Sequence, residues 1–213
     1  MKALQEREIH MKIKYMGAFS GNEEDLPRKP HRPGTVQFRE PDMKKLALRA
    51  NVIALVIIAF LFAILAFQSW FTVDGWSFVL GALASLVCAI PHEYIHAICF
   101  RETAYIYTNL KQGMLFVVGP EDMTKGRFIF MSLLPSIVFG LIPYAAGLVL
   151  HNVFLATLGA TSLGMGSGDY INVWNALWQM PKGALTYLYG FHSFWYQPHD
   201  SRQQPAGTEA ETE

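Results

Sequence analysis

The sequence predicts an all-α integral membrane protein with four transmembrane helices and a short cytoplasmic β-hairpin-like loop between the second and third helices. Three observations lead to this class. Of the 213 residues, 52% are hydrophobic and 16% are charged, whereas soluble domains carry about 25% charged residues. Four apolar stretches each reach the length of roughly 20 residues that a spanning helix needs. The lysines and arginines that flank these stretches fall only on one side of the predicted membrane.

The four spans are predicted at residues 50–71, 77–100, 128–150 and 153–178. The first contains no charged residue, and residues 42–49 can run directly into it as a helix. A short polar turn at 72–76 leads into the second span. The third and fourth spans are separated by the short break at 151–152, so they are expected to form a pair of neighbouring antiparallel helices.

The distribution of positive charge predicts the orientation of these spans. Lysines and arginines precede the first span, lie between the second and third, and follow the fourth, and the other two turns have none. Because such residues accumulate in short cytoplasmic segments, we expect a multi-pass protein of the cell membrane with both termini in the cytoplasm. The first 45 residues lack the apolar core of a secretory signal peptide, so the first span is expected to act as its own membrane signal.

The regions around the spans are polar or aromatic. Residues 1–40 are expected to form a cytoplasmic extension with little core of its own, residues 41–196 the membrane domain, and residues 197–213 a disordered polar tail. The net charge is zero, which gives no basic surface for nucleic acid and excludes that class of partner. The aromatic residues 187–196 are expected to lie on the cytoplasmic interface of the bilayer, with His192 as a surface residue.

Two β-prone runs, 104–108 and 114–118, lie in the loop between the second and third spans. Their spacing is typical of a hairpin. The free edge of such a hairpin could take up an extended substrate by strand addition. The alternative is that the loop is a plain connector.

The residues from position 92 to 96 read HEYIH, an HExxH motif near the end of the second span. Two histidines four residues apart on a helix lie on one face, so His92 and His96 can reach a single Zn²⁺, while Glu93 can serve as general base. Pro91 removes a backbone hydrogen bond and predicts a kink directly before the motif. Cys88, one turn earlier, is expected to behave as a small hydrophobic residue rather than a ligand.

A catalytic zinc site typically has three protein ligands, so a third is required. The extended metzincin pattern is excluded, because Cys99 and Glu102 stand where it needs Gly and His. The remaining candidates are Glu102, Glu121, Asp122, His151 and Asp169. At 1.5 Å per residue, His92 and Asp169 both lie about 14 Å inside the cytoplasmic boundary. A bare carboxylate at that depth costs about 2.5–3.5 kcal/mol and needs a partner, so depth favours Asp169.

Small residues recur at every fourth position on two of the spans. The rows are Gly81, Ser85 and Ala89, followed by Glu93, and Ala156, Ala160, Gly164 and Gly168, followed by Asp169. Because small residues let membrane helices approach closely, we expect spans two and four to pack together; the alternative is that both rows are merely packing seams. Asn172 and Asn175 are candidates for binding substrate or orienting ligands, or else for bridging helices.

In these residues the chain resembles the intramembrane zinc proteases of the site-2 protease class, which carry HExxH in one membrane helix and a ligating Asp in a later one. More closely, it resembles a bacterial family of small four-span zincin peptidases. This resemblance covers about residues 40–196, through the HExxH motif, the Gly-Asp pair at 168–169 and the turn at 181–184.

The resemblance implies a role for each motif residue. It implies His92, His96 and Asp169 as ligands of one Zn²⁺ per chain, and Glu93 as the catalytic base. One departure is visible, because Tyr170 follows Asp169 where site-2 proteases usually have Gly.

Together these observations predict a zinc-dependent endopeptidase that hydrolyses peptide bonds of membrane-embedded or membrane-proximal proteins near the cytoplasmic face. Two alternatives belong to other classes. One is a non-catalytic scaffold or chaperone that retains the motif, and the other is a metal-sensing or transport protein. A transport path would need further polar residues along the spans, and spans one and three have almost none.

Overall fold

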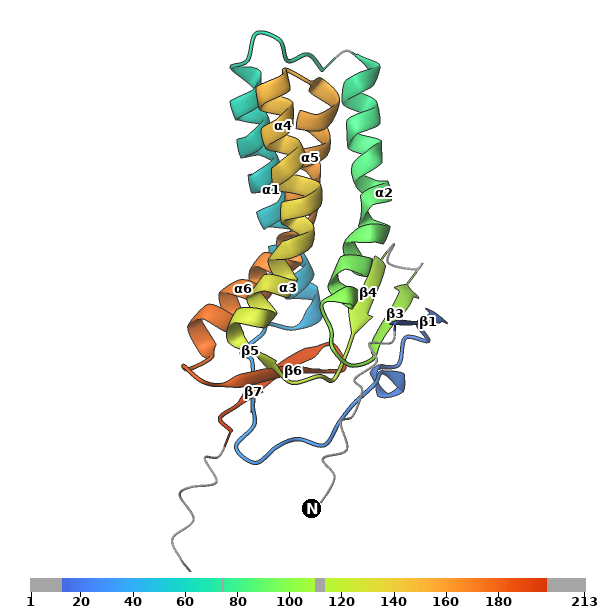
Figure 1. The fold of residues 1–213 in the computed structure, drawn as a ribbon, viewed down its shortest axis with the longest axis vertical. Helices are drawn as coiled ribbons and strands as arrows, with labels where there is room; N and C mark the ends of the chain where they lie inside the picture. The colour runs from blue at the N-terminus through green and yellow to red at the C-terminus, as the bar shows by residue number, and fades with distance from the viewer. Residues whose placement is uncertain (1–12, 74, 110–113, 199–213) are drawn as a thin grey trace, which may run out of the picture.

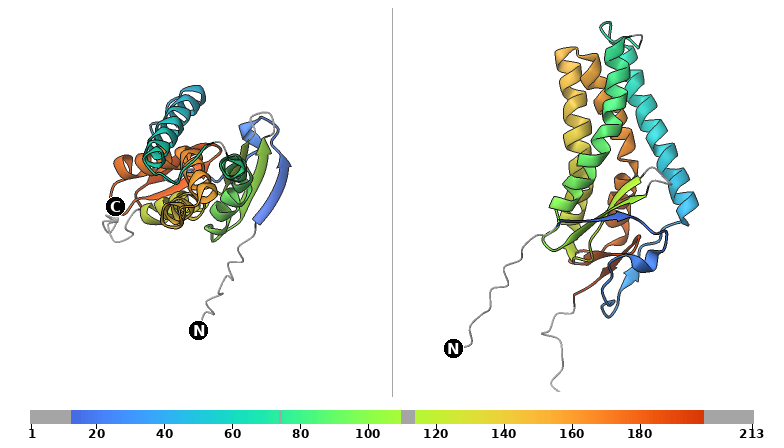
Figure 2. Two further views of the ribbon diagram at one scale, coloured as in Figure 1. Left: turned by 90° about the horizontal axis from the view of Figure 1, so that it is seen from above. Right: turned by 90° about the vertical axis from the view of Figure 1, so that its right-hand side faces the viewer.

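In the computed structural model, a bundle of upright helices stands on a layer of short strands (Figure 1). The structure describes residues 13–73, 75–109 and 114–198. The strands lie together at one end of the bundle in Figure 1 and in the right-hand view of Figure 2. Residues 92–96, which hold the HExxH motif, lie near the end of the bundle that meets the strands.

The helical part contains three runs that are long and apolar enough to cross a membrane. They are α1 (Met43–Ala66), α2 (Trp76–Ile98), and a third run made of α3 (Lys125–Ser136), the π-helical η2 (Ile137–Leu141) and α4 (Ile142–Leu150). The first helix begins before residue 50, as expected from the sequence, because the Asp42 side chain accepts a hydrogen bond from the Lys45 N–H and caps it.

The expected fourth span is not one helix but two. They are α5 (Val153–Met165) and α6 (Ser167–Gln179), which meet at Gly166. With 13 residues and 1.5 Å per residue, α5 measures roughly 20 Å, which is less than the ~30 Å of a hydrocarbon core. The prediction of a single helix over 153–178 is therefore wrong, and an apolar helix followed by a more polar one takes its place.

The all-α class is also corrected, because the described residues form two sheets as well. The strands are β1 (Ile13–Ala18), β2 (Val36–Gln37), β3 (Ala104–Asn109), β4 (Met114–Val118), β5 (Met123–Thr124), β6 (Leu185–Tyr189) and β7 (His192–Tyr196). The first sheet has the order β1-β3-β4 and the second the order β2-β7-β6-β5. A short 3₁₀ helix, η1 (Glu23–Asp25), follows β1.

The hairpin predicted in the loop between the second and third spans is confirmed. Strands β3 and β4 pair antiparallel, with Tyr105 opposite Val118 and Thr108 opposite Leu115. Strand β1 pairs parallel with the other side of β3. Among the described residues, β4 is therefore an edge strand of this sheet.

The aromatic stretch 187–196, expected on the membrane interface, forms most of a second hairpin. Strands β6 and β7 pair antiparallel, with Tyr187 opposite Phe194. Gly190 begins the two-residue connection with a φ of 62°, a backbone angle that glycine adopts without strain and that tight hairpins need. Thr186 and Tyr187 of β6 and Ser193 and Tyr196 of β7 are buried in this hairpin.

The N-terminal segment, expected to have little core of its own, shares the core of the remainder. Strand β1 joins the first sheet and β2 the second. The side chains of Leu26 and Phe38 are 3% and 2% exposed. Phe38 packs in the cluster that also contains Phe100, at the end of α2, and Phe128 of α3.

The close approach of α2 to α5 confirms the expected packing of the second span on the fourth. A Cβ added at Gly81 would lie 2.6 Å from the Phe154 carbonyl oxygen and 2.9 Å from the Thr157 Cβ. The small row on α5 faces other helices instead. At Gly147 of α4, an added Cβ would lie 2.3 Å from the Ala156 nitrogen. The rows are therefore packing surfaces, and only that of α2 lies between α2 and α5.

A buried ion pair joins the ends of α2 and α3 to the strands. The Glu121 carboxylate pairs with the Arg127 guanidinium and accepts hydrogen bonds from the backbone N–H groups of Arg101 and Glu102. Burial alone would raise the pKa of Glu121, but these donors outweigh it and hold the pKa below its ordinary value.

We expect Gly81→Ala to destabilise the protein by about 1–3 kcal/mol, because the added methyl overlaps α5. The measurement is thermal unfolding of the purified protein in detergent. Gly126→Ala is the matched control, since a Cβ there meets no atom within 4 Å, and it should leave stability unchanged or raise it by up to about 1 kcal/mol. Equal melting temperatures for the two variants would contradict the packing described here.

The lowered pKa of Glu121 predicts an acid-sensitive contribution to stability. This contribution is complete above the ordinary glutamate pKa of about 4.3 and is lost as the pH falls through the lower pKa of the folded protein. Glu121→Gln should cost roughly 2–4 kcal/mol at neutral pH and lose less stability than the wild type between about pH 6 and 3. Unfolding curves across this range test it, with the exposed Glu102→Gln as control; parallel pH profiles for wild type and Glu121→Gln would refute it.

Candidate metal centre

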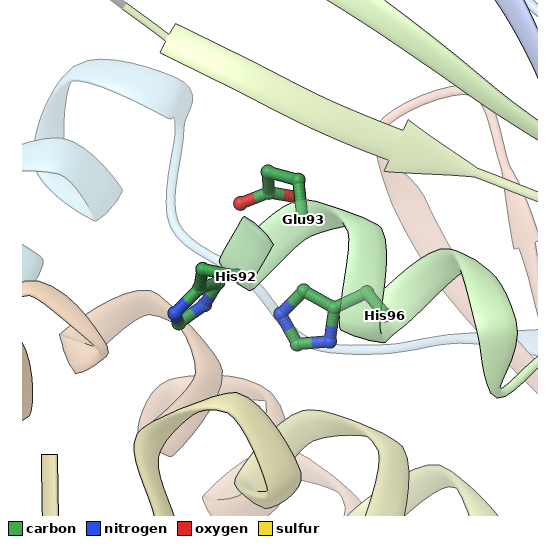
Figure 3. A group of neighbouring side chains, drawn as sticks. All are labelled: His92, Glu93 and His96. Carbon is green, nitrogen blue, oxygen red and sulfur yellow. The ribbon is translucent and has the colours of Figure 1, made fainter. Parts of the chain in front are cut away.

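Helix α2 presents the HExxH motif in its last two turns, and it runs unbroken through Pro91. The rings of His92 and His96 project from the same side of the helix, and Glu93 extends from an adjacent side (Figure 3). The ring centroids lie 4.9 Å apart. The nearest possible ligand atoms of the two histidines and Glu93 all lie within 4.8 Å of one another.

Asp169, in the first turn of α6, reaches both histidines. Its Oδ2 lies 3.1 Å from Nε2 of His92, and its Oδ1 lies 3.3 Å from Nε2 of His96. The three side chains are between 10% and 16% exposed. The structure thus brings together the carboxylate and the two imidazoles that the depth argument singled out, each carboxylate oxygen facing a different ring.

A backbone contact fixes the orientation of the His96 ring. Its Nδ1 lies 3.0 Å from the Met131 carbonyl oxygen on α3. A carbonyl can only accept, so Nδ1 carries the proton and donates it, and Nε2 keeps its lone pair toward Asp169. Metal-binding histidines are typically held in this way by a partner on the second ring nitrogen.

The break between α5 and α6 gives Asp169 its position. A Cβ at Gly166 would lie 2.2 Å from the Ser136 Oγ, so only glycine allows α3 to come this close. The Asp169 N–H donates to the Gly166 carbonyl at 3.0 Å and begins the new helix. The Tyr170 hydroxyl donates to the Leu163 carbonyl of α5 at 2.8 Å, and this bond ties the two helices across the break.

The other residues considered as a third ligand are engaged or lie elsewhere. Glu121 is paired with an arginine, and Asp122 lies 2.5 Å from a lysine of the N-terminal segment. His151 caps the far end of α4 and stacks on Trp70, with ring centroids 5.4 Å apart. Glu102 is exposed. Of the candidates, Asp169 is the one that the structure places beside the histidines.

The two amides further along α6 are placed differently from each other. Asn175 is 8% exposed, and its Oδ1 accepts a hydrogen bond from the Gln179 side chain at 3.0 Å. Gln179 in turn accepts from the Arg39 N–H, so Asn175 takes part in a bridge between α6 and the segment before α1. Asn172 is half-buried, one turn after Asp169.

The residues present fit a zinc ion. Two imidazole nitrogens and one carboxylate form a donor set found in catalytic zinc sites, where a fourth position stays open for water. His96 is held in the tautomer that leaves its inner nitrogen free to bind. His192, expected at the surface, lies on β7 with its Nδ1 3.5 Å from Glu40, and it takes no part in this cluster.

Residues 85–185 match the protein family described as "Putative zincin peptidase". The match agrees with the resemblance drawn from the sequence, and the matched segment contains the HExxH motif together with Asp169. No curated protein and no solved structure gives a significant match to the chain.

We expect the purified protein to hold about one zinc per chain and Asp169→Ala to bind it at least tenfold more weakly, because one of three ligands is lost. Metal analysis after dialysis against a zinc buffer provides the measurement. His192→Ala removes a histidine outside the cluster and should keep its zinc. Undiminished zinc in Asp169→Ala would remove this residue from the site.

Proposed function

We propose that this chain, whose residues 85–185 match the zincin peptidase family, is a zinc-dependent endopeptidase that cuts membrane-embedded or membrane-proximal proteins near the cytoplasmic face. One observation carries the proposal. The two carboxylate oxygens of Asp169 lie 3.1 and 3.3 Å from ring nitrogens of His92 and His96 at the end of an apolar helix, and Glu93 lies beside these histidines. A cluster of this kind within apolar helices marks a functional site rather than a packing feature.

Zinc bound there would polarise a peptide carbonyl and lower the pKa of a water molecule toward neutrality. Glu93 would then act as the base that takes a proton from the attacking water. The water oxygen forms the new bond to the carbonyl carbon, and the carbon–nitrogen bond breaks. Glu93 passes the same proton to the leaving amine nitrogen. The Glu93 carboxylate lies within 4.8 Å of the histidine nitrogens, close enough to take the proton from the water and to give it to the amine.

The placement at the cytoplasmic face rests on charge and on aromatic residues. The lysines and arginines near the apolar helices lie toward the strand-bearing end, as in cytoplasmic segments. Trp76, at the start of α2, and Trp178, near the end of α6, are 80% and 72% exposed. Aromatic residues of this kind mark the two membrane interfaces. The histidines therefore lie toward the cytoplasmic side, and both ends of the described chain face the cytoplasm.

The first sheet offers a binding mode for an extended substrate. Strand β4 packs against α2 and runs past Glu93, with β3 on its far side (Figure 3). Its free edge could pair with the backbone of an unwound segment and hold it beside the cluster. Pairing of this kind relies on main-chain hydrogen bonds, so it would accept substrates that differ in sequence.

Glu93→Gln tests catalysis separately from metal binding. We expect the variant to retain zinc, because the ligands remain, and to lose about 10²–10⁴-fold in cleavage rate. The readout is the set of new N-termini in membrane fractions of cells that express wild type or variant, with Glu102→Gln as control. Identical cleavage products in both, with zinc bound, would favour a non-catalytic scaffold, a metal sensor or a transporter.

A further inference from the structure

The last turn of the metal helix is held by a side chain of another helix. The carbonyl groups at a helix end have no partner within the helix. The Arg127 Nη2 of α3 donates to one of them, the Cys99 carbonyl, at 2.7 Å. Cys99 follows His96 by three residues, so this bond acts within one turn of the metal cluster.

The same arginine is itself held in place by Glu121. One carboxylate oxygen of Glu121 pairs with Arg127, and the other accepts from the N–H groups of Arg101 and Glu102 at 2.6 and 3.0 Å. The Glu121 side chain is 5% exposed. Donors from both sides thus satisfy the buried carboxylate, and it links the chain just after α2 to the first turn of α3.

The metal cluster depends on the same two helices. Met131, whose carbonyl accepts from His96 at 3.0 Å, follows Arg127 by one turn of α3. Helices α2 and α3 are therefore cross-linked twice, by Arg127 to the Cys99 carbonyl and by His96 to the Met131 carbonyl. Sliding one helix by a single residue is a shift of about 1.5 Å, which exceeds the tolerance of a hydrogen bond.

We propose that Arg127 and Glu121 are positioning residues for the metal centre: they fix α2 against α3 in the register at which His96 is oriented for the metal. The proposal rests on the metal site put forward under the proposed function. We call Glu121, Arg127 and the backbone groups of residues 99, 101 and 102 the clasp. Its two side chains have a role beyond stabilising the fold, because a folded protein without the clasp would bind zinc more weakly.

Arg127→Lys and Glu121→Gln test the proposal by zinc affinity. Lysine keeps the charge but lacks the planar fork that reaches two partners at once. Competition with a chelator, at a temperature where each variant is folded, should show zinc binding about 10–100-fold weaker than in wild type. Asp122→Asn is the matched control, because it breaks a neighbouring ion pair to Lys29 that touches neither α2 nor α3.

A second readout does not depend on the metal. Both cysteines are free and half-buried on or at the end of α2. Maleimide labelling of Cys99 should become several-fold faster in both clasp variants, and labelling of Cys88, about three turns earlier, should not change. Asp122→Asn should label like wild type. If Arg127→Lys does not fold, Glu121→Gln, which keeps the side-chain volume, provides the same comparison.

The outcomes separate this proposal from the proposed function. Weaker zinc binding together with faster Cys99 labelling supports the positioning role. Wild-type zinc affinity in folded clasp variants overturns it, even if they melt at a lower temperature. If wild type itself binds no zinc, the proposed function fails, and the labelling rates decide alone whether the clasp holds the end of α2. Unchanged labelling then overturns the clasp as well.

Discussion

The structure around the metal cluster depends on placing one carboxylate between two imidazoles among apolar helices. Burying a charged carboxylate without a partner is unfavourable. Asp169 avoids this cost only if both histidine nitrogens stay near 3 Å from its oxygens. That requirement explains the glycines at the helix contacts. Gly81 lets α2 lie against the α5 backbone, and Gly166 lets α6 begin against α3.

The sheets complete the placement from the other end of the bundle. Helix α2 has few buried residues along most of its length, but His96 and Ala97 are buried where the strands meet it. The cluster of Phe38, Phe100 and Phe128 joins the N-terminal segment, the end of α2 and the start of α3 in one core. The metal cluster therefore lies at the junction of two kinds of packing: loosely covered apolar helices on one side and a closed core on the other.

The sequence contains strong signals for the motif and the long helices and weak ones for the remainder. The spacing of His92 and His96 is a property of one helix, so it could be predicted without tertiary contacts. Counting residues along a helix was also enough to single out Asp169, which the structure places beside both histidines. The break at Gly166 could not, because the close contact there is with the Ser136 side chain of another helix. The Met131 carbonyl leaves no trace in sequence, since every residue has one. The hairpin at 185–196 did carry a signal, because Gly190 lies between two β-prone runs, but its aromatic content favoured a membrane interface.

The arrangement of the first sheet also limits how an extended chain could approach the cluster. A hairpin has two free edges, and pairing could occur at either of them. Strand β1 occupies the outer edge of β3, in parallel, with Lys14 beside Tyr105. Among the described strands, the edge of this sheet next to Glu93 then belongs to β4, which packs on α2. The N-terminal segment thus places the other edge of this sheet on β1, one strand further from the cluster, and leaves β4 as the edge strand beside the carboxylate and the histidines.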